Sequence, residues 1–169
     1  SGALQQMLEQ TLWGDLDILL VDMPPGTGDI QLTLTQKAAI AGAVIVTTPQ
    51  DIALLDARKG IEMFAKVQVP ILGVIENMAT HVCTACGHEE AIFGADGGRL
   101  LAQQYGVAVL ASLPLSMAIR EAADQGLPLV RSAPESAAAQ AFTTAADSLW
   151  TALQRTQPET GPIITMGDD

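Results

Sequence analysis

A carboxylate followed at once by a glycine-containing turn is the first pattern in the sequence that could do chemistry. Asp22 ends a run of apolar residues and is followed by Met-Pro-Pro-Gly-Thr-Gly-Asp. A carboxylate at the end of a buried strand can hold a magnesium ion, usually through water. Gly26 and Gly28 let the backbone approach a phosphate closely, because no Cβ stands in the way. The alternative interpretation is a polar turn between a strand and a helix, with Asp29 as the N-cap.

The second pattern is a C-x-x-C pair, Cys83 and Cys86, flanked by His81 and His88. Two thiolates at this spacing can bind one face of a metal, but a complete zinc or iron–sulfur site usually needs four ligands. Three interpretations stay open. A symmetric dimer could bring two pairs together around one shared cluster, or the two cysteines and two histidines could bind zinc alone. A thioredoxin-like redox pair is the third, although Gly-His-Glu-Glu begins a helix poorly. The histidines are better explained as solvated loop residues than as ligands.

Polar or turn-forming residues also follow two later apolar runs. Asn77 comes after residues 71–75, and Pro114 begins a turn after residues 107–113. An amide side chain at the end of a strand can read the edge of a nucleobase through its donor and acceptor. Taken alone, Asn77 is explained more simply by capping or turn formation.

Composition limits the classes of partner. The chain has 169 residues, of which 49% are hydrophobic and 16% charged, which predicts one domain or most of one with a sizeable core. Its net charge of −11 argues against nucleic acid as a partner. No apolar run approaches the roughly 18 residues of a membrane span, which argues against a membrane partner as well. Two cysteines without a disulfide framework fit a reducing cytoplasm. The start at Ser1 rather than Met suggests a fragment or a processed product.

The elements that must position these residues alternate between strand and helix. Short apolar runs predict strands, and apolar residues at helical spacing predict the helices between them. The predicted strands cover residues 16–21, 43–47, 71–75 and 107–113, and the predicted helices cover 30–39, 51–66, 96–105, 116–124 and 134–153. The alternation predicts an α/β fold, a mostly parallel sheet with helices on both faces. Ligands bind such sheets beyond the carboxyl ends of the strands, where the candidate residues stand. Residues 1–155 are predicted to form one partial domain with a cysteine loop at 81–88, and 156–169 a loose tail.

Four segments together resemble motifs of the Mrp/ApbC group within the MinD/ParA-like P-loop ATPases. In chain order they are LLVDMPPGTGDIQLT at 19–33, VTTPQD at 46–51, GVIENM at 73–78 and CTACG at 83–87. The similarity runs from about Ser1 to Ala138, and the combination of motifs is highly specific.

The resemblance implies a homodimeric, cytoplasmic iron–sulfur cluster carrier that binds and hydrolyses ATP, with client apoproteins and assembly factors as partners. It implies that Cys83 and Cys86 hold a [4Fe–4S] cluster bridged between two subunits. It also implies roles at the nucleotide. Asp22 would serve the Mg²⁺–phosphate region, Gly26, Thr27 and Gly28 would approach the γ-phosphate, Asn77 would contact adenine, and the turn after Pro114 would line the base pocket.

One expected motif is missing from the chain. The sequence contains no G-x-x-x-x-G-K-[ST] loop, whereas members of the family carry a deviant Walker A loop with its lysines in their N-terminal part. We therefore expect the phosphate cradle and the first strand and helix of the fold upstream of Ser1, and we expect this chain by itself to lack ATPase activity. Two rival functions are a non-enzymatic zinc-binding interaction module and a MinD-like positioning ATPase without metal. The C-x-x-C pair and the lack of a basic amphipathic helix at the C-terminus argue against the second rival.

Overall fold

The computed structural model describes residues 6–8, 10–24, 28, 31, 33–35, 38–83 and 85–156. Two candidate residues, Gly26 and Thr27, lie outside the described residues, as does the predicted tail beyond Thr156. No helix in the described ranges is both long enough and apolar enough to cross a membrane.

The centre of the fold is a parallel sheet of three strands, in the order β1-β2-β5. The strands are β1 (Ala43–Thr47), β2 (Ile71–Glu76) and β5 (Val109–Ser112). The register places Thr47 opposite Glu76, and Glu76 opposite Ser112. Polar side chains from all three strands therefore meet at the carboxyl end of the sheet, where a ligand is expected.

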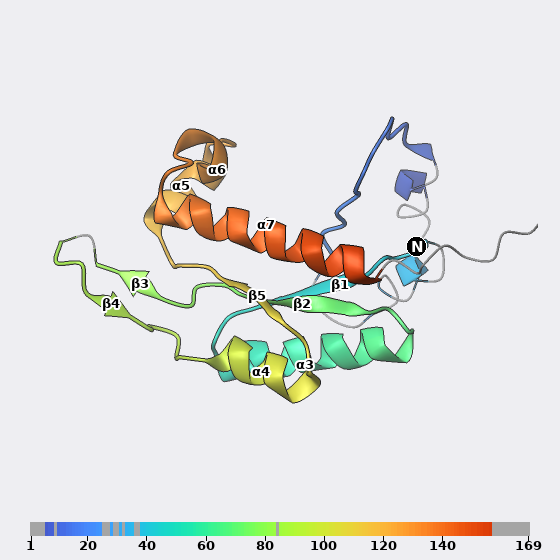
Figure 1. The fold of residues 1–169 in the computed structure, drawn as a ribbon, viewed down its shortest axis with the longest axis horizontal. Helices are drawn as coiled ribbons and strands as arrows, with labels where there is room; N and C mark the ends of the chain where they lie inside the picture. Colours follow the sequence, from blue (N-terminus) through green and yellow to red (C-terminus); the bar gives the residue numbers. More distant parts are fainter. Residues whose placement is uncertain are drawn as a thin grey trace, which may run out of the picture.

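Helices cover both faces of this sheet. Helix α3 (Asp51–Lys66) packs on β1 and α4 (Gly97–Tyr105) on β2, while α7 (Ala137–Thr156) crosses β2 and β5 on the opposite face (Figure 1). The shorter helices α5 (Met117–Asp124) and α6 (Leu129–Ser132) lie together beside the end of α7. Helix α7 covers β2 and β5 but does not extend over β1, so Val46 of β1 is 62% exposed.

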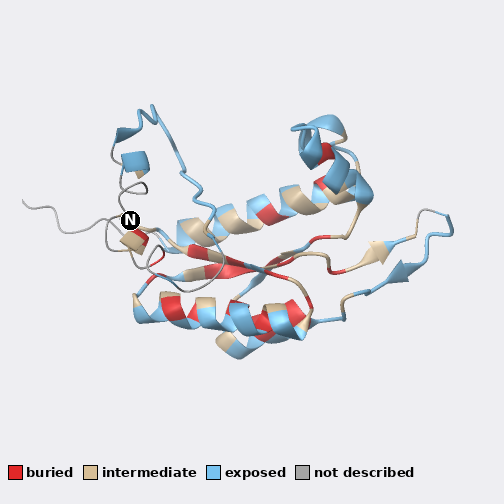
Figure 2. Cartoon of the chain, turned by 180° about the vertical axis from the view of Figure 1, so that it is seen from behind, coloured by how far each residue is buried: buried red, intermediate tan, exposed pale blue. Residues whose placement is uncertain are grey.

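The main core lies between the sheet and the α3–α4 layer, where the buried residues gather (Figure 2). Helix α3 fits this face because its apolar residues recur at helical spacing, and Asp51 and Lys66 at its two ends complement the helix dipole. The core residues are Ile45, Leu54, Ala57, Ile61, Val74, Leu101 and Ala102.

A two-stranded hairpin carries the cysteines. Strands β3 (His81–Val82) and β4 (Glu89–Glu90) pair antiparallel, with His81 opposite Glu90. The hairpin projects from the body of the domain at the end where α5 and α6 lie (Figure 1). The sequence predicts only a loop here, since strands of two residues leave no periodic pattern to recognise.

The fold class is confirmed, and so are most of the later elements. The predicted strands at 43–47 and 71–75 and the helix at 51–66 match the structure closely. The predicted helix at 134–153 is α7, which begins after Ser136, whose hydroxyl accepts the N–H of Ala139 at 3.2 Å. An N-cap serine sets this boundary.

The strand predicted at residues 16–21 is wrong. No residue of this segment is in a strand, and all six are exposed, Leu20 to 78%. A strand persists only when its backbone N–H and C=O groups pair with a neighbour. This segment pairs with none of the strands that the structure describes. Apolar composition is therefore not enough to make a strand here, and Asp22 does not stand at the tip of one.

Candidate functional site

Asn77 fixes the ends of β1 and β2 to each other. Its backbone N–H donates to the carbonyl oxygen of Thr47 at 2.7 Å, and its side-chain Oδ1 accepts the N–H of Met78 at 2.9 Å. Met78 has a φ of 56°, in the left-handed region that residues other than glycine seldom adopt. The side chain of Asn77 thus holds a tight, strained turn at the end of the sheet. Such strain is commonly found at functional sites.

An open cavity of about 420 Å³ runs along β1 and α3, is lined mostly by apolar residues of these two elements, and includes Asn77 in its lining. Thr47 and Thr48 line the same cavity, together with Met23 and Pro24 from the motif that follows Asp22. The structure therefore brings the start of that motif to the strand-end residues, although they lie far apart in the sequence. Gln31 stabilises this arrangement, because its side-chain amide donates to the carbonyl oxygen of Pro24 at 2.9 Å.

Asp22 and Gly28 are both exposed. Asp22 immediately precedes Met23, so its backbone lies next to the cavity even though no strand presents it. Its magnesium role stays a prediction, as do the phosphate contacts of Gly28 and of Gly26 and Thr27, which are outside the described residues.

Pro114 lies in a segment that runs beside the residues following β2. Ala79 donates to the carbonyl oxygen of Leu113 at 2.9 Å, and Leu115 donates to that of Thr80 at 2.7 Å. The described residues that line the cavity do not include Pro114. The turn after Pro114 is instead placed at the base of the cysteine hairpin, and its predicted contact with a base stays a prediction.

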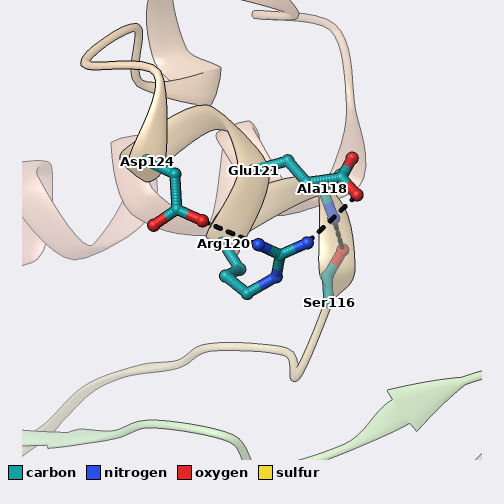
Figure 3. Close-up of polar contacts among 5 residues, drawn as sticks. All are labelled: Ser116, Ala118, Arg120, Glu121 and Asp124. Carbon is teal, nitrogen blue, oxygen red and sulfur yellow. Dashed lines mark hydrogen bonds and ion pairs between the residues drawn. The ribbon is translucent and has the colours of Figure 1, made fainter.

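Helix α5 begins directly after this turn (Figure 3). The Ser116 hydroxyl accepts the N–H of Ala118 at 3.2 Å and caps the helix. Arg120 pairs with Asp124 at 2.7 Å and with Glu121 at 3.2 Å, all on exposed side chains. Its guanidinium is therefore engaged by carboxylates of its own helix rather than directed at the strand ends.

The cysteine turn is closed by backbone hydrogen bonds. Cys83 donates its N–H to the carbonyl oxygen of His88 at 2.8 Å, and Gly87 donates to that of Cys83 at 2.9 Å. Cys83 is half-buried and Cys86 exposed, and both are free thiols. The backbone N–H groups of Ala85 and Cys86 and the Cys86 thiol all donate toward the Cys83 sulfur, which lowers the pKa of Cys83. The turn therefore favours the thiolate, the form that binds a metal.

The two histidines do not complete a metal site around these thiols. The His81 ring nitrogen Nδ1 lies 3.2 Å from the carbonyl oxygen of Leu115, which turns the ring back toward the body of the domain. His88 is exposed. In the part of the chain that the structure describes, no three His, Cys, Asp or Glu residues are placed to hold a metal ion. The C-x-x-C turn thus offers two ligands, half of a four-ligand set.

Similarity to known proteins agrees with this arrangement. The sequence model of one protein family, the NUBPL iron-transfer P-loop NTPases within the ParA group, matches residues 1–150 of this chain. The chain belongs to this family. An iron–sulfur cluster carrier protein from Pseudomonas fragi is 67% identical over 136 residues, which cover 80% of this chain and 47% of that protein. The chain thus spans about half the length of the curated relatives it matches.

Two solved structures of P-loop proteins share the fold. A nucleotide-binding protein from Archaeoglobus fulgidus in complex with ADP has a TM-score of 0.66 and 38% identity, covering 74% of this chain and 51% of that one. The cell division ATPase MinD from Pyrococcus furiosus has a TM-score of 0.52 and 28% identity, covering 66% and 43%. This NUBPL-family chain therefore shares the α/β fold of P-loop NTPases over about half the length of these two structures.

Sequence reasoning missed one buried polar residue at the same edge of the sheet. Glu76, the last residue of β2, is 6% exposed and lies directly before Asn77. A signal was present, because a carboxylate that ends an apolar strand must find hydrogen-bond donors if it is buried. The donors themselves come from distant segments, so the sequence did not identify them.

Proposed function

We propose that the protein containing this chain carries a [4Fe–4S] cluster between two subunits and delivers it to client apoproteins, with assembly factors supplying the cluster. The observation that supports this most directly is the Cys83–Cys86 turn at the tip of a projecting hairpin. It offers two thiols and, among the described residues, no third ligand. Two copies of such a turn would supply the four cysteines of a [4Fe–4S] cluster.

The position and chemistry of the turn suit a cargo site rather than a structural one. Cys86 is exposed and Cys83 only half-buried, so an acceptor protein can reach the ligands. The backbone donors that lower the pKa of Cys83 also reduce charge on a metal-bound sulfur, as hydrogen bonds to cluster thiolates do. The proposal places the protein in the reducing cytoplasm, where free thiols persist.

We further propose that Mg²⁺ and ATP bind at the carboxyl end of the sheet. Asn77 lines the cavity beside β1 together with Met23 and Pro24, which follow Asp22, and Asn77 stands at the strand ends, where α/β sheets bind ligands. Asn77 would contact the base, and Asp22 would organise Mg²⁺. Gly26, Thr27 and Gly28 would approach the γ-phosphate, and the part of the protein outside this chain would supply the remaining phosphate cradle. Bound ATP would supply a phosphoryl group for transfer to water, a reaction that such sites use to change conformation.

Anaerobic reconstitution of the whole protein tests the cluster proposal. Loaded protein should be dimeric, absorb broadly in the visible range and contain about four irons per dimer. Cys83→Ala and Cys86→Ala should each abolish loading, whereas His88→Ala, on the same turn, should load normally. A monomer that retains a full cluster would overturn the shared site. Colourless protein that binds zinc through both cysteines and His81 would favour the zinc module instead.

A further inference from the structure

The carboxylate of Glu76 is buried at the point where three elements meet. Its Oε1 accepts the backbone N–H of Gly98, at the start of α4, at 2.6 Å. Its Oε2 accepts the hydroxyl of Ser112, at the end of β5, at 3.4 Å. Arg99, which follows Gly98 in the sequence, pairs with Asp96 at 2.9 Å, and Asp96 and, to a smaller extent, the charge of Glu76 raise the pKa of Arg99. Hydrogen bonds from a backbone N–H and a hydroxyl therefore satisfy the buried group.

Two consecutive glycines allow α4 to approach the strand ends this closely. A Cβ on Gly98 would lie 2.9 Å from the Cβ of Glu76. A Cβ on Gly97 would lie 2.8 Å from the carbonyl oxygen of Pro49, in the turn after β1. Both distances are shorter than ordinary contact, so neither position admits a side chain without displacing the helix. The start of α4 is thus in contact with the ends of both β1 and β2.

The hydrogen bond from Gly98 to Glu76 also closes the base of the segment that carries the cysteines. This segment leaves the sheet after Glu76 and returns at Gly97, with the hairpin between. Its outgoing limb is tied to the chain after β5 by the bonds from Ala79 to Leu113 and from Leu115 to Thr80. Its returning limb ends in α4, which the Glu76 carboxylate holds directly. Both ends of the hairpin segment are therefore fixed at the carboxyl end of the sheet.

We propose that Glu76 is a positioning residue that couples the cavity beside β1, through Asn77, to the cysteine hairpin. Asn77, which lines the cavity, is the next residue in the chain, and its N–H bond to Thr47 ties it to β1. In this proposal, a ligand that shifts this turn moves the adjacent Glu76, whose hydrogen bond to Gly98 carries the shift to the start of α4 and the returning limb. The inference rests on the proposed function for the identity of the ligand, a magnesium–nucleotide complex.

Thiol alkylation provides the test, because Cys83 and Cys86 report directly on the hairpin. In metal-free, reduced whole protein, the alkylation rates of both cysteines are measured with and without Mg-ADP and assigned by mass spectrometry. Mg-ADP affinity is measured separately by calorimetry. We expect Mg-ADP to change the Cys83 rate at least about fivefold in the wild type, the low end of typical coupling between sites. Glu76→Ala should reduce this change to less than about twofold while Mg-ADP still binds.

Conservative and control variants separate positioning from general destabilisation. Glu76→Gln should retain the nucleotide effect, because its amide oxygen still accepts from Gly98 and its amide nitrogen can donate to Ser112. Glu62→Ala is the matched control, since Glu62 accepts the Tyr105 hydroxyl at 3.2 Å at the opposite end of α4. It should leave the effect unchanged. If Glu76→Ala does not fold, Gly98→Ala decides, because it displaces the helix and keeps the carboxylate.

The possible outcomes are distinguishable. A nucleotide effect that persists in Glu76→Ala, or in Gly98→Ala where that variant decides, overturns the coupling. A wild-type protein that binds Mg-ADP without any change at Cys83 also overturns it and leaves the proposed function intact. A wild-type protein that fails to bind Mg-ADP contradicts the proposed nucleotide site itself, and the coupling with it.

Discussion

The backbone N–H of Cys83 donates to the carbonyl oxygen of His88 at 2.8 Å, across the turn that carries both cysteines. Gly87 donates to the carbonyl oxygen of Cys83 at 2.9 Å, so the turn is closed from both sides by its own backbone. A metal or cluster that binds here therefore meets ligands already close to one another. Ordering the ligands beforehand reduces the free-energy cost of binding.

The first prediction concerns the reactivity of Cys83. The N–H of Ala85, the N–H of Cys86 and the Cys86 thiol lower the pKa of Cys83. The reactive thiolate should therefore persist to lower pH than in an ordinary cysteine and be lost as the pH falls through this lowered value. The alkylation rate of Cys83, measured against pH in metal-free protein, gives the pH midpoint at which the thiolate is lost.

Substitutions in the turn test the cause of this shift. Ala85→Pro removes the N–H donor that lowers the pKa of Cys83 most, so the pH midpoint of Cys83 alkylation should rise. Cys86→Ser replaces the thiol donor and should also change this midpoint. Ala85→Gly keeps the N–H and serves as the control, with little change expected. Identical midpoints in Ala85→Pro and Ala85→Gly would show that the backbone donor does not stabilise the thiolate.

The second prediction concerns Asp22 in the whole protein. Asp22→Asn keeps the shape of the side chain and removes the charge proposed to organise Mg²⁺. Loss of one electrostatic element of such a site commonly costs on the order of 10²-fold in turnover, so ATP hydrolysis should fall by about this factor. Steady-state phosphate release measures it. Asp17→Asn, an exposed carboxylate earlier in the same segment, is the control and should hydrolyse ATP normally. Equal turnover in the two variants would leave Asp22 as a turn residue.

The elements that sequence reasoning predicted correctly are those whose partners lie within the described chain. Strands β1 and β2 pair with each other, and α3 packs on β1, so local pattern and tertiary packing favour the same structure. Residues 16–21 have the composition of a strand but pair with no described strand, and their prediction failed for this reason.

The candidate site shows the same division. The cysteine pair and Asn77 are visible in the sequence because their residue types and local spacing indicate chemistry. The role of Glu76 is not visible in the sequence, because it depends on donors from Gly98 and Ser112, which long-range packing brings to it. The hairpin that presents the cysteines is held by four paired residues, too few for a periodic signal.

The third prediction tests the packing of the fold with two glycines. A Cβ on Gly73, in the central strand, would lie 2.6 Å from Leu110 Cγ and 2.8 Å from the carbonyl oxygen of Ala108. Gly73→Ala should therefore lower the free energy of unfolding by about 1–3 kcal/mol, as overpacking does.

A Cβ on Gly60, inside α3, meets only Ile45 Cδ1 at 3.8 Å, an ordinary contact. Gly60→Ala should raise the free energy of unfolding by about 0.5–1 kcal/mol, because alanine favours the helix. Urea denaturation of the two variants and the wild type measures both changes, and a stabilising Gly73→Ala would contradict the close approach of β2 and β5.

The last prediction concerns this 169-residue chain by itself. A triphosphate is normally held by consecutive backbone N–H groups at a helix N-terminus together with a lysine, and the chain has no G-x-x-x-x-G-K-[ST] loop to supply them. Its net charge of −11 further opposes a polyanion. Contacts from Asn77 to a base must first offset the cost of immobilising the ligand, at least about 4 kcal/mol. We therefore expect no ATP hydrolysis and an affinity for Mg-ATP no tighter than roughly millimolar, or about −4 kcal/mol.

The cysteine turn should still load a cluster, since its hydrogen bonds lie within residues 83–88. Calorimetric titration of the purified chain is the measurement, with the whole protein as the positive control. Micromolar binding by the chain alone would mean that the phosphate site lies within this chain.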